Sequence, residues 1–144
     1  MANSGLSAFL HPVRPVNEEK EVVISDRFQN ADGSPMKFKI RALSQDENKA
    51  LRAQATRKVK ENGQWAEHFD MDDFSARIIV AATVFPDFRA KEVCDAAGVS
   101  DPLLVPRKWL KSGEYARLSS AILELCAFDD SPEGEAAIEA EVKN

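Results

Sequence analysis

The sequence predicts an α+β fold, mainly helical, in which an N-terminal antiparallel β-hairpin packs on a small helical bundle. Two observations predict it: a run of strictly alternating apolar and charged residues near the N-terminus, and several apolar stretches with helical period in the second half. The 144 residues suit one domain. We divide them into an N-terminal arm (1–20), a globular domain (21–128) and an acidic flexible tail (129–144).

The arm contains Pro12 and Pro15 and has one apolar anchor, LSAFL. A hairpin is expected after it, over residues 21–43. EVVISDRF is rich in β-branched residues, and in MKFKIRAL the side chains of Met36, Phe38 and Ile40 alternate with cations. Period-two alternation is typical of a strand with one buried face. The QNADGSP between the two runs is a cluster of turn formers, so the strands are expected to pair antiparallel.

This turn also resembles the middle of a calcium-binding loop, since Asn30, Asp32 and Gly33 fit part of the pattern D-x-[DN]-x-[DN]-G. In that register Phe28 replaces the first carboxylate, and Lys39 replaces the bidentate glutamate that closes such a site. We therefore interpret the segment as a turn. Its Asp and Asn side chains are expected to bond nearby backbone, and Gly33 to take a positive φ.

The first helix is expected over residues 45–61, because Ser44 and Glu47 have the spacing of a capping box. We take Gly63, in ENGQW, as the residue that ends this helix. Its surface is basic, with no acidic residue between Asn48 and Lys60. This surface would bind an acidic segment of a partner or the chain's own tail; the alternative is a solvated face.

The second helix, over residues 72–85, is apolar almost all the way round and is therefore expected to be the central core element. Asp70 and Asp73 occupy the positions of its N-cap and N3 residues, where a carboxylate stabilises a helix. Pro86 is expected to end it.

Three more helices complete the predicted bundle, over residues 89–97, 101–111 and 113–127. Gly98 would close the first of them, and Asp101 would cap the second. The third is amphipathic. Its apolar stripe consists of Tyr115, Leu118, Ile122, Leu125 and Cys126.

Catalytic and metal-binding motifs are missing: no phosphate-binding glycine loop, H-E-x-x-H, G-x-S-x-G or paired-cysteine motif occurs. Cys94 and Cys126 stand among apolar residues, so we expect reduced core cysteines. His68, Asp70 and Asp72 are residues that a metal site would use, but helix capping and solvated charge explain them as well. We expect no enzyme activity, no cofactor and no metal.

The charge is unevenly distributed. Residues 129–144 contain six acidic side chains and one basic side chain, whereas residues 1–128 contain 18 of each. A balanced body argues against general nucleic-acid binding and marks the tail as a separate piece. Apolar runs fall short of the roughly 20 residues of a membrane span, and LSAFL is too short for a signal peptide. We expect a cytoplasmic protein without membrane contact.

The joint order of several phrases resembles the XkdN-like tail assembly chaperones of phages and prophages. These phrases are LSAFL followed by PV, VVISDRF…DG…MKFKIRALS, ATVFPDF, and LKSGEYARL leading to CAFDD, and they cover residues 5–130. The resemblance implies a non-virion protein in the host cytoplasm that binds the tape measure protein and keeps it soluble while the tail tube assembles. The tail tube protein is a second candidate partner, and self-association stays open. The family implies no catalytic or cofactor residue.

A chaperone for exposed helices needs apolar surfaces or strand edges, together with charges that keep the complex soluble. The open edge of the hairpin is one candidate contact surface. For each aromatic candidate contact residue, the alternative is that its side chain is buried in the core. The candidate contact residues are Phe85, Phe88, Trp109, Tyr115, Lys49, Arg52, Arg57 and Lys60. The alternative function is a small nucleic-acid-binding or regulatory phage protein that uses the basic helix over residues 49–60. A third hypothesis is an enzyme that uses His68 with Asp70 or Asp72.

Overall fold

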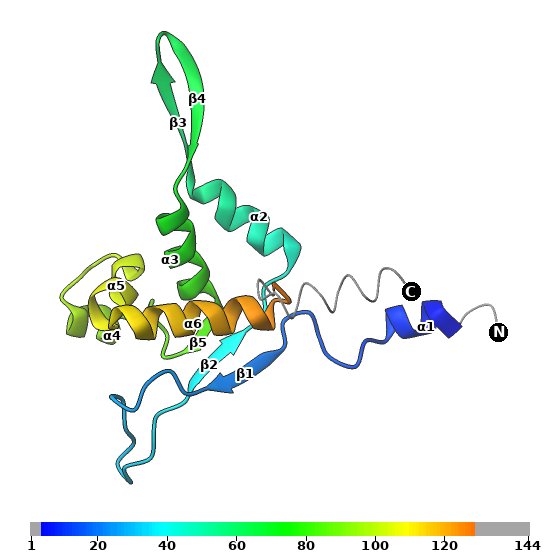
Figure 1. The fold of residues 1–144 in the computed structure, drawn as a ribbon, viewed down its shortest axis with the longest axis vertical. Helices are drawn as coiled ribbons and strands as arrows, with labels where there is room; N and C mark the ends of the chain where they lie inside the picture. Colours follow the sequence, from blue (N-terminus) through cyan, green and yellow to red (C-terminus); the bar gives the residue numbers. More distant parts are fainter. Residues whose placement is uncertain (1–3, 129–144) are drawn as a thin grey trace.

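The structure is a computed structural model that describes residues 4–128. A body of helices lies against a three-stranded antiparallel sheet, and three segments project from it: the N-terminal arm, the loop between the first two strands, and a second β-hairpin (Figure 1). The α+β class is confirmed, although the arrangement differs from the prediction in several places. No helix within residues 4–128 has the length and apolar character needed to cross a membrane.

The three-stranded sheet has the order β1 (Glu19–Val22), β2 (Phe38–Arg41), β5 (Thr83–Phe85). β1 and β2 form the predicted antiparallel hairpin, with Val22 opposite Phe38. The predicted alternation is present, since Phe38 and Ile40 are buried while Lys39 is exposed and its Nζ lies 2.9 Å from Oε2 of Glu19. β1 and β2 are shorter than predicted, and a long loop joins them.

The third strand corrects the prediction of a helix over residues 72–85. The helix α3 spans Met71–Ala82, and Thr83–Phe85 pairs antiparallel with β2. β-branched and aromatic residues favour a strand, and the residue before a proline, here Phe85, is disfavoured in a helix. β5 therefore covers one edge of the β1–β2 hairpin, which the sequence had suggested as an open edge.

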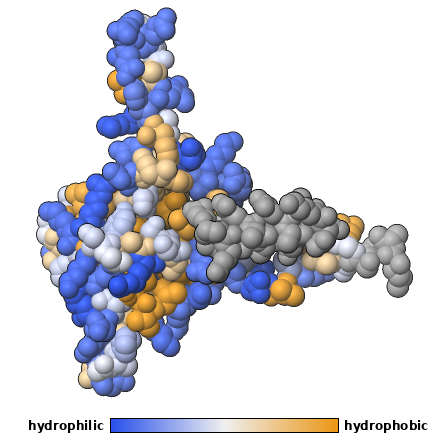
Figure 2. Space-filling view, viewed as in Figure 1, coloured by the Kyte–Doolittle hydropathy of each residue, from blue (hydrophilic) through white to orange (hydrophobic). Residues whose placement is uncertain are grey.

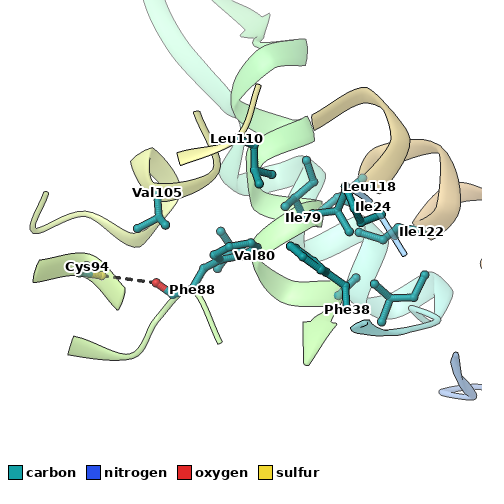
Figure 3. Packing of buried hydrophobic residues seen from close by; sticks show 13 residues of the cluster. Ile24, Phe38, Ile79, Val80, Phe88, Cys94, Val105, Leu110, Leu118 and Ile122 are labelled. Atoms are coloured by element: carbon teal, nitrogen blue, oxygen red, sulfur yellow. Dashed lines mark hydrogen bonds between the residues drawn. The ribbon is translucent and has the colours of Figure 1, made fainter. Parts of the chain in front are cut away.

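α3 is the central core element, as predicted. Its buried side chains are Ala76, Ile78, Ile79, Val80 and Ala82. Leu118 and Ile122 of α6 (Ser112–Leu125) lie near Ile79, and Val80 lies beside Phe88 (Figure 3). The core thus forms where α3 meets α6 on one side and the segment that follows β5 on the other.

The second correction concerns the helix predicted over residues 45–61. The helix α2 spans only Gln45–Gln54, and the chain continues as a hairpin of β3 (Thr56–Glu61) and β4 (Gln64–Phe69). The turn is Asn62–Gly63, with φ of 52° and 78°. Asn-Gly with both residues at positive φ is the most favoured two-residue hairpin turn, so Gly63 closes a hairpin and does not end a helix.

The predicted helix caps are present. Ser44 Oγ accepts a hydrogen bond from the Glu47 N–H at 3.2 Å, and Glu47 Oε1 accepts one from the Ser44 N–H at 3.1 Å. Asp70 Oδ1 likewise accepts from the Asp73 N–H at 3.1 Å. Each bond satisfies a backbone donor that the first turn of a helix leaves free.

The remaining helices follow the prediction with one change. α4 spans Lys91–Ala97 and ends at Gly98, whose φ is 72°. The segment predicted as one helix over 101–111 is a 3₁₀ turn, Pro102–Leu104, followed by α5, Val105–Trp109. Asp101 caps the turn by accepting from the Leu103 N–H at 3.0 Å.

An ion pair between the exposed Arg27 and the buried Glu114 ties the β1–β2 loop to α6. Nε and Nη2 of Arg27 donate to the two carboxylate oxygens of Glu114, at 3.0 and 2.7 Å. Arg27 also donates to the Trp109 carbonyl at 2.7 Å, and the Lys111 N–H donates to Glu114 at 2.8 Å. Hydrogen bonding to Arg27 is the main cause that lowers the pKa of Glu114 to about 2.

The arm contains a short helix that the sequence analysis did not predict, α1 (Ser4–Leu10). Both cysteines are free: Cys94 is buried, and its Sγ donates to the Phe88 carbonyl (Figure 3), whereas Cys126 is only partly buried. The predicted acidic tail, 129–144, lies outside the described residues.

Candidate partner-binding surfaces

The aromatic candidates divide between the core and the surface. Phe88 is 1% exposed and packs in the core, so its prediction as a contact residue was wrong for this fold. Phe85 on β5 is 55% exposed and Trp109 at the end of α5 is 45% exposed, so both offer apolar area. Tyr115 is half-buried beside a hollow of about 430 Å³, and its hydroxyl donates to Ser75 Oγ at 3.5 Å.

The basic candidates were predicted to lie on one helix. They do not, because that helix ends at Gln54. Lys49 and Arg52 lie on α2, and with Lys58 of β3 they border a hollow of about 420 Å³. The Arg52 guanidinium stands over the Phe69 ring, with Cζ 4.2 Å from the ring centroid. This cation–π contact fixes α2 against the base of the hairpin.

One face of the hairpin extends this basic surface away from the body. Residues directly opposite each other in an antiparallel pair share a face. The pairs Lys58–Glu67 and Lys60–Trp65 are separated by one pair, so they lie on the same face. Trp65 is 71% exposed and borders a second hollow of about 580 Å³ with Lys58 and Glu67. We call Lys49, Arg52, Lys58, Lys60, Trp65 and Glu67 the α2–hairpin face.

Arg57 is separated from the other basic candidates. Its partner in the register is His68, so both lie on the opposite face of the hairpin. There His68 Nε2 lies 2.6 Å from Oε1 of Glu61. The sequence had grouped Arg57 with Lys60, but a period of two along a strand places them on opposite sides.

The cluster His68, Asp70 and Asp72 is not assembled as a metal site. His68 pairs with Glu61, and Asp70 caps α3. Within residues 4–128 no group of three or more His, Cys, Asp or Glu side chains is placed to hold a metal ion.

The loop around Asp32 has the predicted turn geometry. Asp32 Oδ1 accepts from the Ser34 N–H at 3.0 Å and from the Ser34 hydroxyl at 2.6 Å, and Gly33 has φ of 88°. These bonds lower the pKa of Asp32, with the Ser34 hydroxyl as the main cause. The carboxylate therefore serves the local backbone, as the sequence indicated.

Sequence reasoning missed Lys58, Trp65 and Glu67, because the hairpin that carries them was taken for a helix and its end. A signal was available. The Asn62–Gly63 dipeptide is the strongest two-residue hairpin signal, and the runs on either side of it contain the strand-favouring residues Thr56, Val59, Trp65 and Phe69.

Known proteins share both the sequence and the fold. Residues 6–143 match the family of phage XkdN-like tail assembly chaperone proteins. The YqbN protein of Bacillus subtilis (strain 168) is 37% identical over 119 residues, which is 81% of this chain and 79% of YqbN. The phage-like element PBSX protein XkdN of the same organism is 31% identical over 141 residues, covering 95% of this chain and 93% of XkdN.

The crystal structure of YqbN superposes with a TM-score of 0.67 at 32% identity and covers 85% of this chain and 96% of that chain. The family match extends past residue 130, where the resemblance of individual phrases had ended. With this match over nearly the whole length, the chain belongs to the XkdN-like family of phage tail assembly chaperones.

Proposed function

We propose that this chain binds the tape measure protein of its tail and keeps it soluble while the tail tube assembles. It acts by binding, without catalysis, in the cytoplasm of the bacterial host, and does not enter the finished particle. The tail tube protein is a second candidate partner. Family membership supports the role in tail assembly, and the surface of the chain supports the binding of long apolar helices.

The observation that carries the proposal is the N-terminal arm. α1 has only seven residues and projects from the body (Figure 1), and Phe9 on it is 80% exposed, with Leu6 and Leu10 also exposed. An isolated helix of this length is not stable in water. It gains stability when its apolar side chains pack on another surface, and an amphipathic partner helix offers such a surface.

Apolar side chains on the body extend the same argument. Val84 and Phe85 of β5 and Trp109 of α5 are exposed, although they belong to elements that contribute to the core. Apolar residues also gather over the base of the second hairpin and lower on the same side of the molecule (Figure 2). We propose Phe85, Trp109 and Tyr115 as apolar contacts, and the cations of the α2–hairpin face as polar contacts around them.

Co-expression with the tape measure protein tests the proposal. We expect the soluble fraction of the tape measure protein to rise several-fold and the two chains to elute together from a sizing column. Absence of co-elution at micromolar concentration contradicts tape measure binding.

Point variants locate the surface. Phe9→Ser and Phe85→Ser each remove exposed apolar area without disturbing the core, and each should reduce the co-eluting fraction several-fold. Val23→Ser is the matched control, because Val23 is an exposed apolar residue of the β1–β2 loop. Equal losses in all three variants contradict the proposed contacts.

A second candidate function is nucleic-acid binding, favoured by one observation: the α2–hairpin face combines four cations with an exposed tryptophan. Such a surface is typical of single-strand binding. The balanced charge of residues 1–128 stands against it. Retention on single-stranded DNA that falls steeply between 50 and 200 mM salt would favour this candidate.

A further inference from the structure

We propose that the α2–hairpin face binds the chain's own acidic C-terminal segment, residues 129–144. The face has four cations and one carboxylate, Glu67. Lys49, Arg52, Lys58 and Lys60 take part in none of the ion pairs found within residues 4–128. Their charge is therefore available to an acidic ligand.

The C-terminal segment has the complementary charge. Its six carboxylates, against Lys143 alone, account for the whole net charge of −5. Its sequence also has apolar residues at helical spacing: Ile138 and Val142 are four residues apart, and so are Glu135 and Glu139. A helix formed on the face would place these four side chains on one side. That side would offer carboxylates to the cations and apolar groups to Trp65.

The segment starts at the right place. After α6 the Sγ of Cys126 accepts a hydrogen bond from the Leu43 N–H at 3.3 Å, and Leu43 directly precedes the N-cap of α2. The end of α6 therefore lies beside the start of α2 (Figure 1). From there the face runs along α2 and out along β3.

The segment is also long enough. The ten residues of α2 rise about 15 Å, and the six residues of β3 extend about 20 Å. Sixteen residues reach at most about 55 Å when extended, and about 35 Å when the last ten of them are helical. Every cation of the face is thus within reach, and tethering gives the segment an effective concentration of about millimolar. Exposed ion pairs that are individually weak are then enough to hold the segment on the face in the isolated chain, where no partner competes for it.

Zero-length carbodiimide cross-linking of the intact chain tests this contact, because the reagent joins a carboxylate only to an amine that touches it. Peptide mapping of the monomer band should show residues 129–141 linked to Lys49, Lys58 or Lys60. The yield should fall several-fold in 0.5 M salt, since exposed charges are screened. Lys91 and Lys108, which are exposed on α4 and α5, should give few links and serve as internal controls.

A charge reversal that leaves the amines in place provides the second arm. Arg52→Glu should lower the yield several-fold, while Arg107→Glu, an equal charge change on α5, should not. Links spread evenly over all lysines, links found only between two copies, or equal effects of both variants would overturn the proposal.

An optical measurement is independent of the cross-linking chemistry. Trp109→Phe leaves Trp65 as the only tryptophan, and Trp65→Phe leaves Trp109. Acrylamide quenching of Trp65 should rise about two-fold between 50 mM and 0.5 M salt, while quenching of Trp109 stays constant. Quenching of Trp65 that does not respond to salt contradicts the contact. All these readouts use the isolated chain, so their failure leaves the proposed chaperone function standing.

Discussion

Glu114 is a buried carboxylate that accepts hydrogen bonds from Arg27 and from the Lys111 N–H. Arg27 and Glu114 are 87 residues apart in sequence. No local pattern could have predicted their pairing, because it depends on how the β1–β2 loop folds back onto α6. A buried charge that loses its partner is costly, which makes this pair a specific test of the fold.

Glu114→Gln should lower the free energy of unfolding by about 2 kcal/mol, because the neutral amide loses its charge pairing with Arg27 and its –NH2 group cannot accept a bond from the guanidinium. Urea denaturation measures the change. Glu92→Gln is the control, since Glu92 is exposed on α4; its effect should stay within about 0.5 kcal/mol. Equal effects of the two substitutions would contradict the role given to the pair.

Acid should destabilise the protein partly through the same residue. Its folded pKa of about 2 lies below the ordinary value of 4.5, so its stabilising contribution is complete above pH 4.5 and is lost as the pH falls towards 2. The free energy of unfolding, measured between pH 7 and pH 3, should therefore fall less in Glu114→Gln than in the unaltered chain. If the free energy of unfolding fell equally with pH in both proteins, Glu114 would not contribute to the acid sensitivity.

Thr83 offers a stabilising substitution. Its side chain is buried at the start of β5, and Oγ1 contacts no hydrogen-bonding group within residues 4–128. Thr83→Val keeps the shape, removes the unsatisfied polar atom and suits a strand, so it should raise the free energy of unfolding by about 1 kcal/mol. Thermal unfolding would show a melting temperature higher by a few degrees; a lower one contradicts the burial described.

At the scale of helices and strands, the sequence predicted best those features that have a short-range cause and also suit the packing of the whole fold. The capping residues Ser44 and Asp70 and the alternation around Phe38 have short-range causes, and each is found in the structure. Residues 83–85 were predicted as the end of a helix, because the pairing of β5 with β2 is a tertiary contact that three residues do not specify by themselves. The candidate site was half predicted: Lys49, Arg52 and Lys60 of the α2–hairpin face were named, but Lys58, Trp65 and Glu67 were not.

The β3–β4 hairpin depends on its turn more than on packing. Gly63→Ala places a Cβ at φ of 78°, which costs about 1 kcal/mol. Because the hairpin has little buried surface to offset this cost, we expect its amides to exchange with deuterium several-fold faster, while amides of α3 keep their rates. Gly5→Ala, in α1, is the control. Faster exchange in α3 would mean that the hairpin supports the core.

In the molecule as a whole, the residues that form the core and the surfaces proposed to bind partners belong to different parts of the chain. The core cluster draws on the three-stranded sheet, α3, α6 and the segments between them, and no residue of the hairpin from 56 to 69 belongs to its buried set. The α2–hairpin face and the α1 arm project from this body (Figure 1). Changes in the projecting parts should therefore alter association without unfolding the chain.

Shortening the hairpin tests this division. Replacing residues 58–67 by Asn-Gly keeps Arg57 and His68 as the last pair of the ladder, along with Phe69, whose ring contacts Phe74 at a centroid distance of 5.4 Å. The shortened chain should unfold cooperatively, with a melting temperature within about 5 °C of the full chain, the shift expected from about 1 kcal/mol in a domain of this size. Calorimetry measures this shift. Loss of cooperative unfolding would mean that the hairpin is part of the folding unit, whereas a cooperative transition with weakened association would assign it to binding.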